Sequence, residues 1–280
     1  KIVHNPQSIS ATINMNEQSQ FALNLQNTGG SSLNWSLKGA NGLMGSSFSL
    51  GTVFSSDHFA PLLKGTDDKR NGSPVSTLGG GPDYHGYTWS DSSENAGPDH
   101  IWTDISTTGI LLEELSSTDD GFTNLTLPFS IDFYENSFDQ VFVSSNGYLT
   151  LGQGFSDHNH FPLPTNMMAG NLIAAFASDL DPSRGGNIYY LFDENGLTVQ
   201  YDKVQDFSGQ GEYTFQINLN AGGVIRLKYE NMDGPIDRAT TGIQNASADI
   251  GLLVAYNNQQ IKSDSTVRIS TSPKWLHTSK

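Results

Sequence analysis

The sequence predicts an all-β protein built from antiparallel sheets, and three observations support this fold class. Apolar residues recur at every second position in runs such as 129–133, 141–143 and 149–151, which is the period of a strand with one buried face. Asn146-Gly147 separates two of these runs and suits a tight hairpin turn. The 29 glycines also favour many turns. We therefore expect an antiparallel β-sandwich of the jelly-roll type together with a small immunoglobulin-like sandwich.

The immunoglobulin-like sandwich is expected at the start of the chain. Three strand-like runs follow one another at 9–13, 21–25 and 33–37, as in the first half of such a sandwich. Half a sandwich needs partner strands, and the apolar residues around Val267 and Ile269 precede the ending SPKWL. We expect residues 1–55 and 265–280 to form this domain, so that the central domain is an insertion; a plain C-terminal tail is the alternative.

A linker is expected at residues 56–80, because the strand period is lost and Gly, Ser and Asp are frequent there. The strands resume in a second β-sandwich over residues 81–264. Its hairpins join 188–192 to 197–201 and 213–219 to 225–229. The segment 167–180 is read either as a short helix or as a buried strand.

Composition excludes several classes of function. The net charge of −15 and only 14 Lys and Arg residues argue against nucleic-acid binding. The absence of cysteine excludes disulfides, thiolate metal sites and a cysteine nucleophile. No apolar run has the length of a membrane span, and no signal-peptide core opens the chain. We expect a soluble protein whose export signal has been removed or lies outside this sequence.

Four stretches resemble nidogen-like β-sandwich modules and occur in the order found there. They are GPDYHGYTWSDSSENAGPDHIWTDIS (81–106), LPFSIDFYENSFDQVFVSSNGYLTLG (127–152), NLIAAFASDLDPSRGGNIYY (171–190) and TTGIQNASADIGLLVAYN (240–257). The similarity covers about residues 81–262, and the flanks resemble the ends of an immunoglobulin-like repeat into which such modules are inserted. The sequence departs from the family pattern at Ala177-Ser178-Asp179 and at Phe133-Tyr134-Glu135.

The resemblance implies a non-catalytic accessory, adhesive or spacer region of a larger secreted or cell-surface bacterial protein. Such modules accompany subtilisin-like proteases, so a catalytic domain of the same precursor is one expected partner. An extracellular glycan, protein or matrix polymer, bound through loops, is the other. A secreted hydrolase acting on carbohydrate or peptide remains the alternative, although the chain lacks Gly-x-Ser-x-Gly and His-Glu-x-x-His.

Asp179 and Asp181 are the candidate metal ligands, because they stand two residues apart before a glycine bend, as in oxygen-rich loops around Ca²⁺. An ion pair with Arg184 or a simple turn is the alternative. Bound calcium here predicts a stiffened structural spacer. His158-Asn159-His160 offers two imidazoles to a transition metal, but a surface loop between strands is the favoured interpretation, because the sequence fixes no third ligand.

Carboxylates and aromatic rings gather in the segment 83–104, a mixture that binds sugars or cations in some proteins and packs as an ordinary loop in others. The candidate ligand-binding residues in this segment are Asp83, Tyr87, Trp89, Asp91 and Asp99.

Overall fold

The computed structural model describes residues 2–5, 24–27, 56–73, 78–194 and 196–271, which fall into two compact units, 1–56 and 57–280. In the first unit, β1 (Ile2–Asn5) pairs antiparallel with β2 (Asn24–Asn27). The other residues of 1–55 on which the immunoglobulin-like prediction depends lie outside the described residues, so an N-terminal sandwich stays a prediction.

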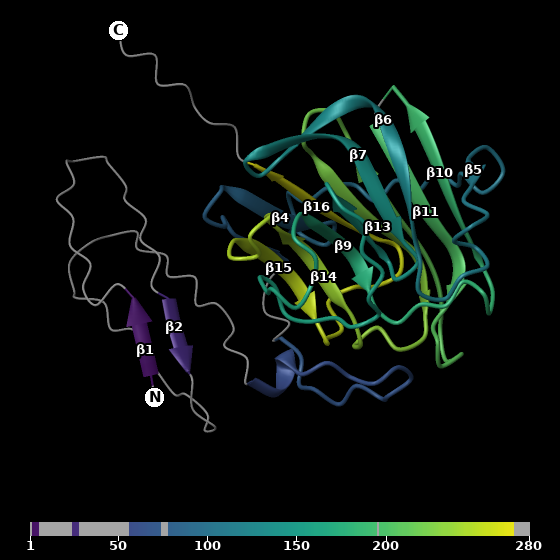
Figure 1. Ribbon diagram of the computed structural model, residues 1–280. Helices are drawn as coiled ribbons and strands as arrows, with labels where there is room; N and C mark the ends of the chain where they lie inside the picture. Colours follow the sequence, from purple (N-terminus) through teal and green to yellow (C-terminus); the bar gives the residue numbers. More distant parts are fainter. Residues whose placement is uncertain (1, 6–23, 28–55, 74–77, 195, 272–280) are drawn as a thin grey trace, which may run out of the picture. The chain divides into compact units, whose positions relative to one another are not determined.

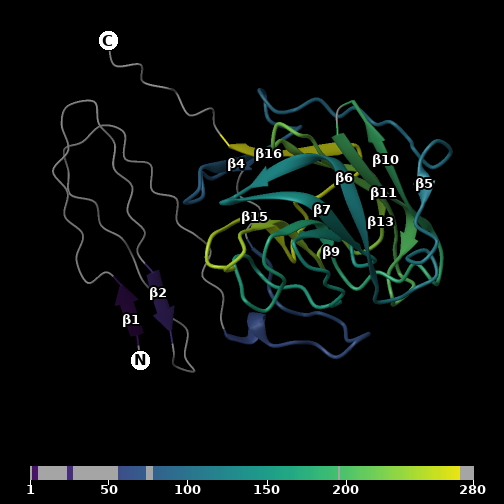
Figure 2. The same ribbon diagram turned by 45° about the horizontal axis from the view of Figure 1, so that its top comes forward.

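The second unit is an antiparallel β-sandwich of two sheets, which Figures 1 and 2 show as facing layers. The prediction of an all-β sandwich is thus confirmed. The eight-stranded sheet has the order β3-β4-β16-β13-β12-β11-β10-β5, and the six-stranded sheet has the order β15-β14-β9-β8-β7-β6. The bounds are β3 Gly79–Gly80, β4 Tyr87–Asp91, β5 Ile110–Leu111, β6 Phe122–Phe133, β7 Asn136–Ser144, β8 Tyr148–Leu151, β9 Leu172–Ala177, β10 Asn187–Asp193, β11 Gly196–Gln205, β12 Glu212–Leu219, β13 Ile225–Asp233, β14 Thr240–Gln244, β15 Gly251–Tyr256 and β16 Ser265–Thr271.

The predicted hairpins form where the sequence placed them. Strands β7 and β8 join at Asn146-Gly147, and Gly147 has φ +81°. A Cβ atom at Gly147 would lie 2.1 Å from the carbonyl oxygen of Phe176, so this turn has room for glycine alone. Strand β10 pairs with β11 and β12 with β13, as the alternating pattern predicts.

The core lies between the sheets, where the inward-facing residues of most strands are buried. Two buried tyrosines also link the sheets by hydrogen bonds to backbone carbonyls. The Tyr201 hydroxyl donates to the oxygen of Ser144 at 2.5 Å, and the Tyr229 hydroxyl donates to the oxygen of Ala175 at 2.8 Å. Both tyrosines therefore bury a large ring without leaving the hydroxyl unsatisfied.

Strand β9 is buried on both faces, which explains why its sequence, LIAAFA, shows no alternation. One face lines the main core, and the other packs in a second apolar cluster with Phe161, Leu163 and Met168. The segment 167–180 is therefore a buried strand in its second half. Among the described residues there is no α-helix, and the 3₁₀ helix η1 (Ser56–Phe59) is the one helical element.

The C-terminal strand corrects one domain boundary. Strand β16 is hydrogen-bonded between β4 and β13, with Val267 opposite Asp91 on one side and opposite Leu227 on the other. Residues 265–271 thus complete the eight-stranded sheet, because their buried apolar face fits the core of that sheet. They are not part of an N-terminal sandwich. Residues 272–280 lie outside the described residues.

The segment expected to be a linker is partly packed against the sandwich. We call residues 57–73 the strap; it runs along one side of the sandwich in both views (Figures 1 and 2). Its Leu62 amide donates to Asn159 Oδ1 at 2.7 Å, and its Ser73 amide donates to the Tyr256 oxygen at 2.7 Å. At Gly72 a Cβ atom would lie 1.7 Å from the Asn257 oxygen, so the strap requires glycine at this close approach.

Within the described residues, no helix combines the length and the apolar character that crossing a bilayer requires.

Candidate functional site

A cavity of about 100 Å³ lies where the strap crosses the loops of the sandwich. Four other segments, far apart in the sequence, line it together with the strap. They are 158–160, 178–179, 206–213 and 235–238. We call this hollow the strap cavity. The loops that line it connect strands of both sheets.

The strap cavity combines aromatic and charged walls. Phe207 and Tyr213 supply rings, while Arg238 and Asp67 form an ion pair of 2.8 Å between Nη2 and Oδ1. The side chains of Arg238 and Asp67 are 30% and 51% exposed, so solvent reaches this pair. The Arg184 guanidinium lies 5.0 Å from the centre of the Phe207 ring, a cation–π distance.

Beside the strap cavity, Lys64 of the strap lies among three carboxylates. Its Nζ is 2.9 Å from Asp119 Oδ1, 2.6 Å from Asp120 Oδ2 and 2.9 Å from Asp179 Oδ1. Burial alone would lower the pKa of Lys64, but the hydrogen bonds to these three aspartates outweigh it and hold the pKa far above its usual range. Lys64 is therefore a fixed positive charge that joins the strap to both sheets' loops.

The two candidate calcium ligands have different partners. Asp179 accepts from Lys64 Nζ and, at 3.4 Å, from the Gly65 amide. Asp181 is buried, accepts from the Ser183 amide at 3.0 Å and pairs with Arg184 Nε at 3.0 Å. Calcium at Asp179 would have to compete with the Lys64 ammonium group. Calcium binding by this pair stays a prediction.

A second charged group fixes the other half of the strap. Asp68 Oδ2 lies 2.7 Å from Arg70 Nη2, 3.0 Å from His160 Nε2 and 2.7 Å from Asn257 Nδ2. The side chains of Asp68 and Arg70 are 4% and 8% exposed. Burial would raise the pKa of Asp68, but hydrogen bonds from His160 and from Arg70 hold it far below its usual range.

The two imidazoles expected as a metal pair are used separately. His160 is buried and contacts Asp68 and Asn257, whereas the Nδ1 of His158 is 3.7 Å from Asp157 and 3.8 Å from Asp120. The surface-loop interpretation, in which each ring has its own protein partners, fits this geometry better than a shared metal ion.

The candidate ligand residues of the segment 83–104 do not line the strap cavity. Tyr87 and Trp89 lie in the main core, 3% and 6% exposed, so their rings are inaccessible to a ligand. Asp91 is buried and accepts from the backbone amide two residues later at 2.7 Å. Asp83 accepts from three nearby backbone amides and a buried tyrosine hydroxyl. Asp99 is exposed. Ligand binding through Asp83 and Asp99 stays a prediction.

Sequence reasoning missed the strap as part of the site. The charged patch at 64–70 is visible in the sequence, but strap residues without a strand or helix period give no signal of their tertiary partners. Lys64 and its partner Asp119 are 55 positions apart, so their pairing follows from the fold alone.

Comparison with known protein families gives one match. The family model described as NIDO related matches residues 93–278, which is more than half of the chain. No solved structure matches the chain.

Proposed function

Because the chain belongs to the NIDO-related family, we propose that it is a non-catalytic module of a larger secreted or cell-surface bacterial protein, with an extracellular polymer as its ligand. The ligand is a glycan or a protein of the extracellular matrix, and the strap cavity receives one of its groups. Modules of this family are typical of extracellular proteins, which supports the location.

The size of the strap cavity is the observation that carries the proposal. Sites that enclose a small-molecule substrate measure about 300–1,000 Å³, whereas the strap cavity measures about 100 Å³. It has room for one side chain or one end group, while the rest of the ligand would lie on the surface. This proportion suits the binding of a polymer better than the turnover of an enclosed small molecule.

The chemistry of the walls supports a polar ligand group. Arg238 offers several N–H donors and Asp67 offers carboxylate oxygens, both partly exposed, next to the apolar rings of Phe207 and Tyr213. A ligand with hydroxyl or amide groups on an apolar frame matches such a surface. Sugars and peptides both have this character.

The alternative of a hydrolase has less support. Among the described residues, the carboxylates of Asp119, Asp120 and Asp179 have oxygen atoms within 4.8 Å of one another. The Lys64 ammonium group lies within 2.9 Å of all three carboxylates. It occupies the space between them, where a glycosidic bond would have to lie between an acid and a base.

Binding of the full chain to a glycan array and to immobilised matrix proteins tests the proposal. The variant Arg238→Gln removes a charged donor from the cavity wall, and we expect a loss of affinity of about 10-fold or more, because hydrogen bonds to charged groups contribute about 1.5–3 kcal/mol. Arg268→Gln, an exposed arginine on β16, is the matched control and should bind like the unaltered chain.

Two results would contradict this proposal. One is the absence of binding to every polymer tested. The other is equal loss of binding in both arginine variants, which would indicate a general charge effect and not a role of the strap cavity. Release of product from a tested polymer would favour the hydrolase.

A further inference from the structure

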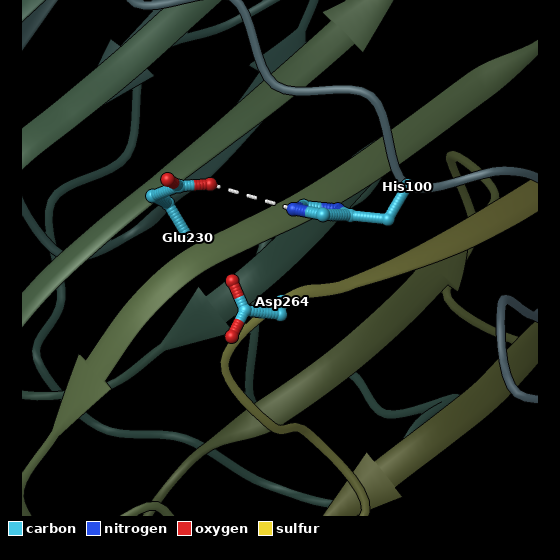
Figure 3. A group of neighbouring side chains, drawn as sticks. All are labelled: His100, Glu230 and Asp264. Carbon is cyan, nitrogen blue, oxygen red and sulfur yellow. Dashed lines mark hydrogen bonds and ion pairs between the residues drawn. The ribbon is translucent and has the colours of Figure 1, made fainter.

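A second group of side chains, distant in sequence from the strap, gathers over the eight-stranded sheet. It consists of His100 in the loop after β4, Glu230 on β13 and Asp264 in the turn before β16 (Figure 3). One ligand atom from each side chain lies within 4.8 Å of the others. We call these three residues the His100 cluster.

The strand register brings the two carboxylates together. Tyr229 of β13 is directly opposite Ser265 of β16 in the antiparallel ladder. Continuing that ladder by one residue places Glu230 next to Asp264, on the face opposite to the core. Like charges directly opposite one another destabilise an antiparallel pair, so this position favours a positive charge between them.

The negative charges of these two carboxylates, Glu230 and Asp264, have no lysine or arginine partner among the described residues. The Glu230 carboxylate lies 3.4 Å from His100 Nε2. The carboxylates beside the strap differ in this respect, because Lys64 lies among them. The His100 cluster is therefore acidic and accessible, with His100 and Glu230 side chains 17% and 39% exposed.

The orientation of His100 suits a metal ligand. Its Nδ1 lies 2.9 Å from the hydroxyl oxygen of Thr266, a fully buried residue. When Nδ1–H donates to this oxygen, Nε2 carries the free electron pair and faces Glu230, as Figure 3 shows. A hydrogen bond on the far nitrogen is the usual way in which proteins orient a metal-binding imidazole.

The distance between the facing atoms also fits two ligands of one ion. His100 Nε2 and Glu230 Oε2 are 3.4 Å apart, which exceeds the usual range of about 2.7–3.2 Å for an N–H···O bond. In a tetrahedral site with bonds of about 2.0–2.1 Å, neighbouring ligand atoms are separated by about 3.3–3.4 Å. Asp264, which is exposed at the turn, can complete the set by rotation of its side chain.

We propose that the His100 cluster binds a divalent transition metal ion, and that Zn²⁺ is the ion that its one imidazole and two carboxylates fit best. Calcium prefers oxygen ligands alone, whereas zinc accepts nitrogen and oxygen together. Three protein ligands leave a fourth position for water or for a group of a partner molecule. The ion joins the loop after β4 to strands β13 and β16.

Isothermal titration of the full chain with Zn²⁺, after treatment with a chelator, tests the site. We expect one bound ion per chain. His100→Ala, Glu230→Gln and Asp264→Asn should each weaken binding by at least about 10-fold, because the loss of an outer partner of a ligand already costs about 10–100-fold. Asparagine is chosen at position 264 because its φ of +55° suits asparagine as well as aspartate.

The matched controls come from a similar pair elsewhere on the module. His85 and Glu135 are 3.7 Å apart and are also partly exposed, so His85→Ala and Glu135→Gln should bind Zn²⁺ like the unaltered chain. Circular dichroism of each variant confirms that it is folded. The proposal is overturned if the chain takes up no zinc, or if folded His100→Ala and Asp264→Asn bind it as tightly as the controls.

Discussion

Removal of the Asp68 charge should release the strap from the sandwich. In Asp68→Asn the nearly buried Arg70 keeps its positive charge and loses its counter-ion, which lies 2.7 Å away between Nη2 and Oδ2. Breaking a buried pair from one side costs about 3–5 kcal/mol, since a buried charge remains uncompensated. We expect the free energy of unfolding to fall by an amount near the lower end of this range, because His160 and Asn257 can rearrange around the new amide.

The control is the neighbouring aspartate. Asp67 also pairs with an arginine, Arg238, at 2.8 Å, but its side chain is 51% exposed. Exposed pairs contribute about 0–1 kcal/mol, so Asp67→Asn should change the free energy of unfolding by less than about 1 kcal/mol. The two variants differ from the natural chain by the same chemical change, one residue apart.

The assays separate release of the strap from unfolding of the whole module. Urea unfolding followed by tryptophan fluorescence measures global stability, and the rate of tryptic cleavage after the exposed Lys69 measures opening of the strap. We expect faster cleavage in Asp68→Asn even if the midpoint of global unfolding shifts little, because the strap can open locally while the sandwich stays folded. Equal cleavage rates and equal stability in both variants would refute the reasoning.

The same pair predicts a pH dependence. The pKa of Asp68 in the folded protein lies below its ordinary value of 3.8, so the carboxylate stabilises the fold above that value and loses this effect as the pH falls through the folded pKa. The difference in stability between the natural chain and Asp68→Asn should be constant above about pH 5 and shrink below about pH 4.

Four further substitutions test other parts of the fold. Lys64→Gln leaves three neighbouring carboxylates without their cation, so the melting temperature should fall and should rise again with added Ca²⁺ more than that of the natural chain; equal responses to calcium in the two proteins would count against this. Gly147→Ala should lose more than about 3 kcal/mol in urea unfolding, since the added Cβ meets a backbone oxygen at 2.1 Å. Gly86→Ala, with φ +101° but nothing within 4 Å, should lose less, about 1–3 kcal/mol, from backbone strain alone. Tyr229→Phe removes an inter-sheet hydrogen bond and should cost about 0.5–1.5 kcal/mol in the same assay.

The strands of the sandwich were predictable because apolar side chains at every second position indicate which face of a strand is buried. Runs such as 213–219 alternate apolar and polar residues, and turn residues separate them from their hairpin partners. Strand β9 was ambiguous for the same physical reason, since burial on both faces removes the alternation. The sheet that β16 joins was predicted wrongly, because an apolar strand does not specify its neighbours.

The candidate site was much less predictable. Asp179 was identified as a candidate metal ligand by its charge and its loop, and it does lie in a cluster of carboxylates. Its positive partner, Lys64, comes from a segment without regular structure, so no period links the two. Tyr87 and Trp89 were instead predicted as ligand-binding residues, although the structure places them in the core. Aromatic residues near aspartates resemble a binding surface in sequence, although their alternation in β4 buries them.

The way in which the strap is attached has a mechanical consequence. Tension applied between the strap and β16 meets two very different anchors, because β16 is held by backbone hydrogen bonds to a neighbour on each side, whereas the strap is held largely by side chains. The strap should peel away first, and its 17 residues (57–73) would then span up to about 55–60 Å when fully extended. Such a reserve of length absorbs a pull on the neighbouring unit while the sandwich stays folded.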